Sequence, residues 1–221
     1  MIAKVKVLSA KVLSNRQKQV LIEANFEVIE ANFIQTTSIS FSLSGVNECL
    51  VFTSQNAVRS ILLHPDCEAL KNKKVFCVGL KTKILLSEAG FEVVAYSDYA
   101  EDLSEIITLI YANETYTFFS GNLRREALPQ ALKNAKIVLN EIEVYTTELT
   151  PKKIQEKADV LLFFSPSGIE SYLKENKIKD EICFCIGKTT AEALEKTTKN
   201  IIIANHPSIE NVIEDVIEEY N

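Results

Sequence analysis

Apolar residues gather in short runs rich in Val, Ile, Leu and Phe. Each run is followed by a polar turn and then by a stretch with apolar positions at helical spacing. This alternation is typical of βαβ units around a parallel sheet that has helices on both faces. The first part of the chain has the same order: a strand over 4–9, a helix over about 15–24 and a strand-like run over 26–34.

One strand–turn–helix pattern occurs twice. Leu50–Val58 is an apolar run that ends in hydroxyl and amide residues, and Leu161–Ile169 repeats it at an offset of 111. Gly79–Thr82 and Gly187–Thr190 match at an offset of 108, each after a second apolar run, and a third short strand follows in both copies. Three matches in one order indicate an internal repeat. The fold class predicted is α/β, with two similar doubly wound parallel-sheet domains.

The repeat also suggests how the domains are divided. The N-terminal unit lies outside the first copy, and we expect it to complete the C-terminal domain. Residues 1–34 and 148–221 then form one discontinuous α/β domain, and residues 38–143 form the other. Residues 34–37 and 144–148 are expected to be two linker strands that act as a hinge, with an active site in the interdomain cleft.

Composition narrows the class of protein. The chain has 221 residues, of which 47% are hydrophobic and 24% charged, which is ordinary for a globular protein. Its net charge of −6 argues against nucleic-acid binding, which usually needs a basic face. No apolar run is long enough to cross a membrane, and lysines interrupt the N-terminus where a secretory signal needs an apolar core. A cytoplasmic location is therefore expected.

Cysteine and histidine offer no obvious site. Four cysteines lie in or beside apolar runs, as reduced buried thiols do: Cys49, Cys77, Cys183 and Cys185. Cys67 is predicted to lie in a loop. Since no second cluster has ligand spacing, no metal site is expected. His64 and His206 each precede a proline and are interpreted as surface residues.

Hydroxyl residues follow the strands of both copies, in turns at 53–56, 80–82, 120–122, 165–167 and 188–190. Such turns bring hydroxyls together with the free N–H groups of a helix N-terminus, which attracts anions. They share the carboxyl edge of a parallel sheet, where ligands usually bind. Any one hydroxyl could simply cap its helix, but five such turns favour an anion-binding edge.

Two further segments carry polar residues without an obvious packing role. Gly121–Leu132 predicts a helix with Arg124 and Arg125 in its first turns, the end at which a helix dipole disfavours cations. A ligand anion would explain them, and so would an ordinary surface position. Tyr145 lies at the predicted linker, where its phenol could face the cleft or simply pack.

Five segments, in this order, resemble the uroporphyrinogen-III synthase family, the cyclase of tetrapyrrole biosynthesis: Val51–Val58, Ser120–Leu132, Val144–Thr147, Phe163–Ile169 and Ile186–Leu194. The resemblance implies a lyase that uses no cofactor and is a monomer. Its implied substrate is hydroxymethylbilane, a linear tetrapyrrole with acetate and propionate carboxylates. The family enzyme removes the terminal hydroxyl, forms a spiro intermediate and closes the macrocycle with the last ring inverted.

The resemblance also implies roles for single residues. Tyr145 matches the tyrosine of the family's Val-Tyr-x-Thr motif and is the candidate catalytic proton donor. The candidate substrate-binding residues are Ser54, Thr82, Ser120, Gly121, Asn122, Arg124, Ser165, Ser167, Lys188, Thr190 and Lys11. Lys11 would replace an arginine that many members have after the first strand. An acidic protein gains no long-range attraction for such a substrate, so binding would depend on local donors.

Two other functions stay open. One is a non-catalytic two-domain binding protein for a small polyanionic ligand, since hinged α/β pairs also bind ligands in a cleft. The other is a signalling or scaffold module. The Val-Tyr-x-Thr motif favours the enzyme, because a plain binding protein has no need of a phenol there.

Overall fold

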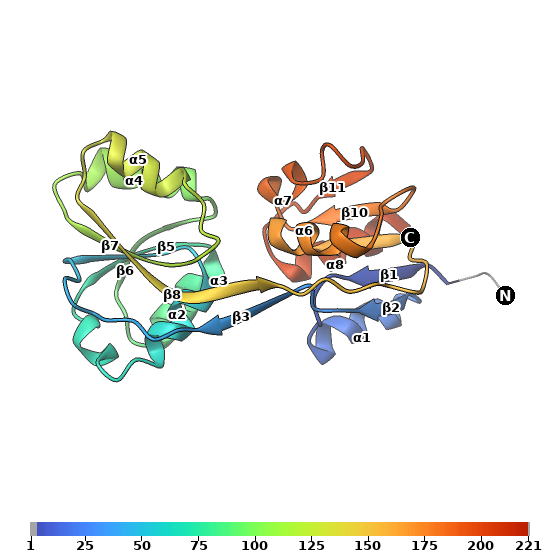
Figure 1. Ribbon diagram of the computed structural model, residues 1–221, viewed down its shortest axis with the longest axis horizontal. Helices are drawn as coiled ribbons and strands as arrows, with labels where there is room; N and C mark the ends of the chain where they lie inside the picture. Colours follow the sequence, from blue (N-terminus) through green and yellow to red (C-terminus); the bar gives the residue numbers. More distant parts are fainter. Residues whose placement is uncertain (1–3, 221) are drawn as a thin grey trace. The chain divides into compact units, whose positions relative to one another are not determined.

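The computed structural model describes residues 4–220 and contains two α/β units (Figure 1). Unit 1 consists of Met1–Gln35 and Glu148–Asn221, and unit 2 of Thr36–Thr147. The chain crosses between the units at 35/36 and 147/148, inside the segments expected to be linkers. The ends of the first predicted domain, residues 1–3 and 221, lie outside the described residues.

Unit 2 is built on a six-stranded sheet in the order β3-β8-β7-β4-β5-β6. Its strands are β3 (Ile34–Ser38), β4 (Cys49–Phe52), β5 (Lys74–Val78), β6 (Val93–Ser97), β7 (Tyr116–Gly121) and β8 (Leu139–Leu149). Its helices are α2 (Gln55–Leu62), the 3₁₀ helix η1 (Cys67–Leu70), α3 (Leu80–Glu88), α4 (Ala100–Ile110) and α5 (Ala127–Asn134). From β8 to β6 the neighbouring strands pair in parallel.

Helices bury both faces of this sheet. Leu50 and Phe52 pack in a cluster with α2 and α3, whereas Cys49 and Val51 pack in a second cluster with α4 and α5. Side chains along a strand point alternately to opposite faces, so a strand covered on both sides must be apolar at every position. This explains the unbroken apolar run of β4 in the sequence.

Unit 1 has a five-stranded sheet in the order β11-β10-β9-β1-β2, in which every neighbouring pair is parallel. Its strands are β1 (Lys6–Ser9), β2 (Glu27–Glu30), β9 (Val160–Phe163), β10 (Ile182–Cys185) and β11 (Ile201–Ile203). Its helices are α1 (Asn15–Glu23), α6 (Pro166–Glu175), α7 (Lys188–Glu192) and α8 (Ile209–Tyr220). Clusters of buried side chains again cover both faces, one with α6 and one with α1 and α8.

The predicted class, two doubly wound parallel-sheet domains, is therefore confirmed. The strand β3 differs from the parallel pattern. The N–H of Ile39 donates to the carbonyl of Val144, and the N–H of Thr150 donates to the carbonyl of Phe33. Residue numbers rise from Phe33 to Ile39 along the first segment, while those of the bonded residues fall from Thr150 to Val144. β3 therefore runs antiparallel to β8. The segment expected to be a separate linker strand is the second half of β8, which is continuous through Leu149.

The thiols lie largely as expected. All five cysteines are free and buried, and Cys77 in β5 and Cys185 in β10 belong to different sheets. The prediction for Cys67 was wrong, because this residue begins the helix η1, where it is buried and packs on the unit 2 core. The prediction for His64 was also wrong. Its ring packs on Phe41 with centroids 4.9 Å apart, and only 15% of its side chain is exposed.

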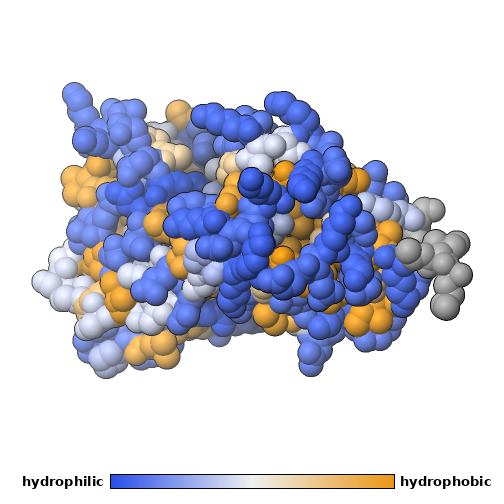
Figure 2. All heavy atoms as spheres, turned by 45° about the vertical axis from the view of Figure 1, so that its right-hand side comes forward, coloured by the Kyte–Doolittle hydropathy of each residue, from blue (hydrophilic) through white to orange (hydrophobic). Residues whose placement is uncertain are grey.

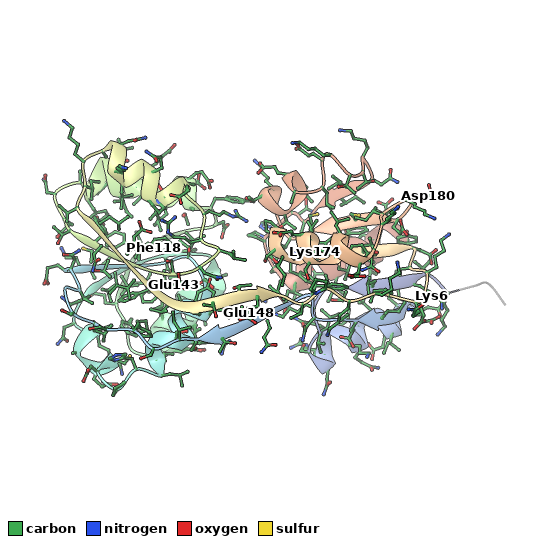
Figure 3. All side chains as sticks on the ribbon, viewed as in Figure 1. Lys6, Phe118, Glu143, Glu148, Lys174 and Asp180 are labelled. Carbon is green, nitrogen blue, oxygen red and sulfur yellow. The ribbon has the colours of Figure 1, made fainter. Side chains whose placement is uncertain are left out.

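Hydrophilic side chains cover most of the face shown in Figure 2, with hydrophobic groups scattered among them. Most large apolar residues are instead inside the units, as for Phe118, which is 1% exposed and lies within unit 2 (Figure 3), although some, such as Leu63 and Leu109, are exposed. Within residues 4–220, no helix combines the length and the apolar character needed to cross a bilayer.

Candidate active site

The ends of three neighbouring strands bring most of the unit 2 candidates to one edge of the sheet. Phe52 of β4 is in register with Phe119 of β7 and with Cys77 of β5. These parallel strands therefore end side by side. Ser54 and Thr82 follow the ends of β4 and β5, and Ser120 is one of the last two residues of β7. The sequence prediction of a shared carboxyl edge in this unit rests on the same geometry.

Ser54 is the N-cap of α2. Its Oγ accepts the backbone N–H of Asn56 at 3.1 Å, and its backbone is extended, as an N-cap requires. The residue is half-buried, so part of its surface faces solvent. The hydroxyl therefore caps the helix, and the remaining N–H groups of the first turn are available to an anion.

Thr82 and Ser120 are buried within the unit. Thr82 is the third residue of α3, and its Oγ1 lies 3.7 Å from the place that a Cβ on Gly79 would occupy. Gly79 has a φ of 88°, a conformation that favours glycine, so this turn packs closely around the threonine. Both hydroxyls are therefore largely shielded from solvent.

Tyr145 is seated on Gly121. The two residues are partners in the register of β8 and β7, and a Cβ on Gly121 would lie 2.5 Å from both Cζ and Cε2 of the tyrosine ring. The ring is half-buried and packs on the cluster beneath α2 and α3. The exposed residues Glu143 and Glu148 belong to the same strand (Figure 3), one before and one after Tyr145 in the chain.

The pairing of β7 with β8 shifts by one residue between Ser120 and Gly121, where the Tyr145 ring packs. Ser120 pairs with Glu143, but Gly121 pairs with Tyr145, so Val144 is the extra residue of a β-bulge. Val144 and Tyr145 consequently pack on the same cluster although they are neighbours in the chain. Bulges commonly redirect a side chain next to an active site.

Asn122 joins the end of β7 to β8. Its Oδ1 accepts the N–H of Thr147 at 2.7 Å, and its Nδ2 donates to the carbonyl of Thr147 at 3.2 Å. Its own N–H donates to the carbonyl of Tyr145 at 3.4 Å. Three predicted residues, Gly121, Asn122 and Tyr145, are thus brought into direct contact.

Arg124 does not lie in a helix. The predicted helix begins only at Ala127, because Pro129 lacks an N–H and fits the first turn of a helix but not its interior. The guanidinium forms ion pairs with Glu126 at 2.6 Å and with Glu141 at 2.5 Å. Its hydrogen bond to Glu126, with Glu141 nearby, raises the pKa of Arg124 further. These carboxylates, and not a ligand, already balance its charge.

The unit 1 candidates share a second sheet edge. Ser9 of β1 pairs with Leu162 of β9, and Leu162 pairs with Phe184 of β10, so these three strands also end together. The residues that follow their ends are Lys11, Ser165, Ser167, Lys188 and Thr190.

The side chains of these residues differ in their exposure to solvent. The Oγ of Ser165 caps α6 by accepting the N–H of Gly168 at 3.1 Å, and it lies 3.1 Å from the Oγ of Ser167. Lys11 and Lys188 are exposed, whereas Thr190 is buried. The lysines are therefore the accessible cations of this edge, and Thr190 belongs to the packed turn.

Ser9 is a residue that sequence reasoning missed. It is fully buried, and its Oγ donates to the carbonyl of Lys11 at 2.5 Å, which fixes the turn after β1. A serine at the end of an apolar strand is the local signal for such a turn. The pairing of Asn122 with Thr147 was also missed, and no local signal predicts it.

A cavity of about 310 Å³ lies elsewhere in unit 2, and Ser38, Ser60, Phe41 and His64 are among its lining residues. None of the candidate residues described above lines it. Within residues 4–220, no group of three His, Cys, Asp or Glu side chains is placed to hold a metal ion. The candidate chemistry therefore centres on Tyr145 and the strand-end turns.

Comparison of the chain with known proteins identifies its family. The family described as "Uroporphyrinogen-III synthase HemD" matches residues 15–214. A curated relative, the porphyrin biosynthesis protein HemD of Ruminiclostridium josui, is 21% identical over 171 residues. The match covers 69% of this chain, which spans about a third (33%) of the length of that relative.

Solved structures share the fold over nearly the whole chain. The uroporphyrinogen-III synthetase of Helicobacter pylori is 19% identical with a TM-score of 0.73, and the match covers 98% of this chain and 100% of that one. A mutant uroporphyrinogen III synthase of Thermus thermophilus is 15% identical with a TM-score of 0.67 and the same coverage. At these identities the likeness establishes the fold. Because the family match extends over most of the sequence, the chain belongs to the uroporphyrinogen-III synthase family.

Proposed function

We propose that the chain is a uroporphyrinogen-III synthase, a lyase that cyclises hydroxymethylbilane with inversion of the terminal pyrrole ring and loss of water. The observation that carries the proposal is the seat of Tyr145 on Gly121, at a sheet edge lined by helix N-termini, in a chain of this family. The activity is a proposal for this chain because it spans only a third of its curated relative.

The strand-end turns would bind the substrate carboxylates. Ser54 and Ser165 mark two helix N-termini with N–H groups available to anions, one in each unit. Lys188 and Lys11 are exposed and would add charge-assisted hydrogen bonds. These donors compensate for the acidic protein's lack of long-range attraction, and they would hold a flexible tetrapyrrole in one conformation.

Tyr145 would supply the chemistry. The substrate loses a hydroxyl group, and a phenol within hydrogen-bond reach can donate a proton to that oxygen as the C–O bond breaks, so that water leaves. The packing of the ring on Gly121 restricts the directions in which the phenol can point. No cofactor is needed in this scheme, since the bilane is itself reactive.

We also propose that the enzyme acts in the cytoplasm as a monomer. Its five free buried thiols support a reducing compartment. Light scattering after gel filtration would give the oligomeric state, and a mass near 24.8 kDa is expected. A stable dimer at assay concentrations would contradict the monomer.

The activity is tested by isomer analysis. Fresh hydroxymethylbilane is incubated with the protein, the product is oxidised, and the porphyrin isomers are separated. We expect the inverted isomer III to form well above the rate in buffer. Formation of isomer I alone, at the rate in buffer, would remove the enzyme proposal and leave a polyanion-binding protein or a scaffold module.

The same assay on Tyr145→Phe tests the proton donor. This variant keeps the ring on Gly121 and removes only the hydroxyl, so the fold should be unchanged. General acid catalysis contributes roughly 100-fold or more, and we expect kcat for isomer III to fall by about that factor. Turnover close to wild type would exclude Tyr145 as the donor.

A further inference from the structure

We infer that Asn122 is a positioning residue for Tyr145 and not a ligand of the substrate. The inference rests on the proposed function, which gives Tyr145 its role. It replaces the substrate-binding role that the sequence suggested for Asn122.

Both ends of the Asn122 amide are directed at one residue. The Oδ1 accepts from the N–H of Thr147 at 2.7 Å, and the Nδ2 donates to its carbonyl at 3.2 Å. A side-chain amide has the same donor and acceptor as a peptide group, so this pair of bonds reproduces one step of a β-ladder. Thr147 is two residues beyond Tyr145 on β8.

The position of this pair explains why it is needed. β7 ends at Gly121, whereas β8 continues to Leu149. Beyond Gly121 the backbone of β7 no longer supports β8, and Tyr145 is the last residue of β8 that is paired with β7. The Asn122 side chain extends that support by one step.

The backbone and the ring of Tyr145 are consequently held by contacts from Gly121 and Asn122. The Tyr145 carbonyl accepts the N–H of Asn122 at 3.4 Å, Thr147 is bound by the Asn122 side chain, and the ring lies against Gly121. Loss of the amide would leave the backbone after Tyr145 bonded to β3 alone, without support from the side of β7. A displacement of about 1 Å can cost 100-fold in rate, so this support bears on catalysis without substrate contact.

A double-mutant cycle tests the inference. The four proteins are wild type, Asn122→Ala, Tyr145→Phe and the double variant, assayed for isomer III. Asn122 is exposed, so its loss leaves no buried polar group and the fold should persist. We expect Asn122→Ala to lower kcat by roughly tenfold or more, with KM changed less than about threefold.

The double variant decides between the two roles. If Asn122 acts through the phenol, the double variant should have a kcat less than about twofold below that of Tyr145→Phe. Effects that multiply, or an effect mainly on KM, would show that Asn122 contacts the substrate and would overturn the inference. Should Asn122→Ala fail to fold, Asn122→Asp takes its place, because it keeps the acceptor for the Thr147 N–H and loses the donor.

Asn140→Ala is the matched control. Asn140 lies on the same strand and also bonds a backbone group through its side chain, since its Nδ2 donates to the carbonyl of Gly45 at 3.1 Å. Its removal costs a similar hydrogen bond at a distance of five residues from Tyr145. We expect kcat and KM of this variant to stay near wild type.

A second readout does not depend on activity. In protein labelled with ¹³C at tyrosine, the Tyr145 ring signals are those that disappear in Tyr145→Phe. Asn122→Ala should shift them and Asn140→Ala should not. Unmoved signals in Asn122→Ala would overturn the positioning role even if the enzyme is active. If wild type forms no isomer III, the proposed function fails, while the ring signals still report on positioning.

Discussion

The ring of Tyr145 occupies the space that a side chain on Gly121 would need. A Cβ at this position would come within 2.5 Å of two ring atoms, closer than real Cβ atoms approach other groups. Gly121 lies outside the positive-φ region, so backbone conformation does not require glycine here. The requirement comes from the neighbouring strand.

Gly121→Ala should therefore displace the phenol. The atoms in conflict are at the far end of a half-buried side chain, which can move. We expect a modest loss of stability, about 1 kcal/mol, and a loss of isomer III activity of roughly tenfold or more. Thermal unfolding and the isomer assay measure the two effects.

The stability control for this change is Gly187→Ala. Nothing lies within 4 Å of the Cβ that it adds, and its backbone is extended. Because Gly187 is the N-cap of α7, where alanine is less favourable than glycine, only a small fall in melting temperature is expected. Full activity of Gly121→Ala would show that the ring has no need of this seat.

Ser54→Ala separates capping from substrate binding. It removes the acceptor for the N–H of Asn56 and should cost about 1 kcal/mol of folding free energy. Ser208→Ala is the matched control, since the Oγ of Ser208 accepts the N–H of Asn211 at 3.1 Å at the start of α8. If the first turn of α2 binds substrate, KM should rise in Ser54→Ala only.

Ser54→Asp sharpens this test. Aspartate is also a good N-cap, so stability should be kept, but its charge should repel a substrate carboxylate and raise KM. The same KM in Ser54→Asp and wild type would place the substrate away from this helix end.

Lys188 and Arg124 should differ in their effect on substrate binding. Within residues 4–220 no ion pair holds the exposed Lys188, whereas Glu126 and Glu141 neutralise Arg124. We expect Lys188→Gln to raise KM by about fivefold, the equivalent of about 1 kcal/mol, and Arg124→Gln by less than about twofold.

The control is Lys174→Gln, which removes a charge from the end of α6 in the same unit (Figure 3). The interaction of Lys174 with Glu170, at 3.9 Å between exposed side chains, contributes little to stability. KM values measured at one salt concentration compare the three variants. Equal increases in all three would indicate a general effect of charge and no site at Lys188.

Stability should fall in alkaline solution. Burial raises the pKa of the Cys183 and Cys185 thiols from 9.0 to about 12. Between these values the unfolded chain has lost protons that the folded chain keeps, so the free energy of unfolding falls as pH rises. The contribution is complete below pH 9.0 and is lost toward about 12.

Urea unfolding at about pH 8 and about pH 10.5 measures this dependence, with a slope near 1 kcal/mol per pH unit for each thiol. Cys185→Ala should have a shallower slope than wild type, whatever its stability at neutral pH. Identical slopes would mean that Cys185 ionises equally in both states.

The fold could be predicted because its cause is local in the sequence. A strand covered on both faces has no position for a polar residue, so Leu50–Phe52 and Leu161–Phe163 are visible as unbroken apolar runs. The hydroxyl residue after each run marks the start of a helix, because the free N–H groups of the first helical turn need an acceptor.

The contacts of the candidate site could not be predicted in this way. Asn122 meets Thr147 across 25 residues, and Arg124 meets Glu141 across a helix and a turn. Such contacts depend on which strands are neighbours, and they leave no periodic pattern. The start of α5 was predictable in principle, because Pro129 excludes a helix that begins at Gly121.

The bulge at Val144 makes the number of residues in β8 as important as their identity. With the extra residue, Tyr145 faces the cluster beneath α2 and α3. Deletion of one residue between Leu139 and Val144 would remove the bulge and leave Tyr145 opposite Gly121, but the side chains between the deletion and Tyr145 would move to the opposite face of the sheet. During evolution, side chains along this strand can be exchanged one by one, whereas a single codon gained or lost there would interchange the buried and exposed positions of β8 in one step.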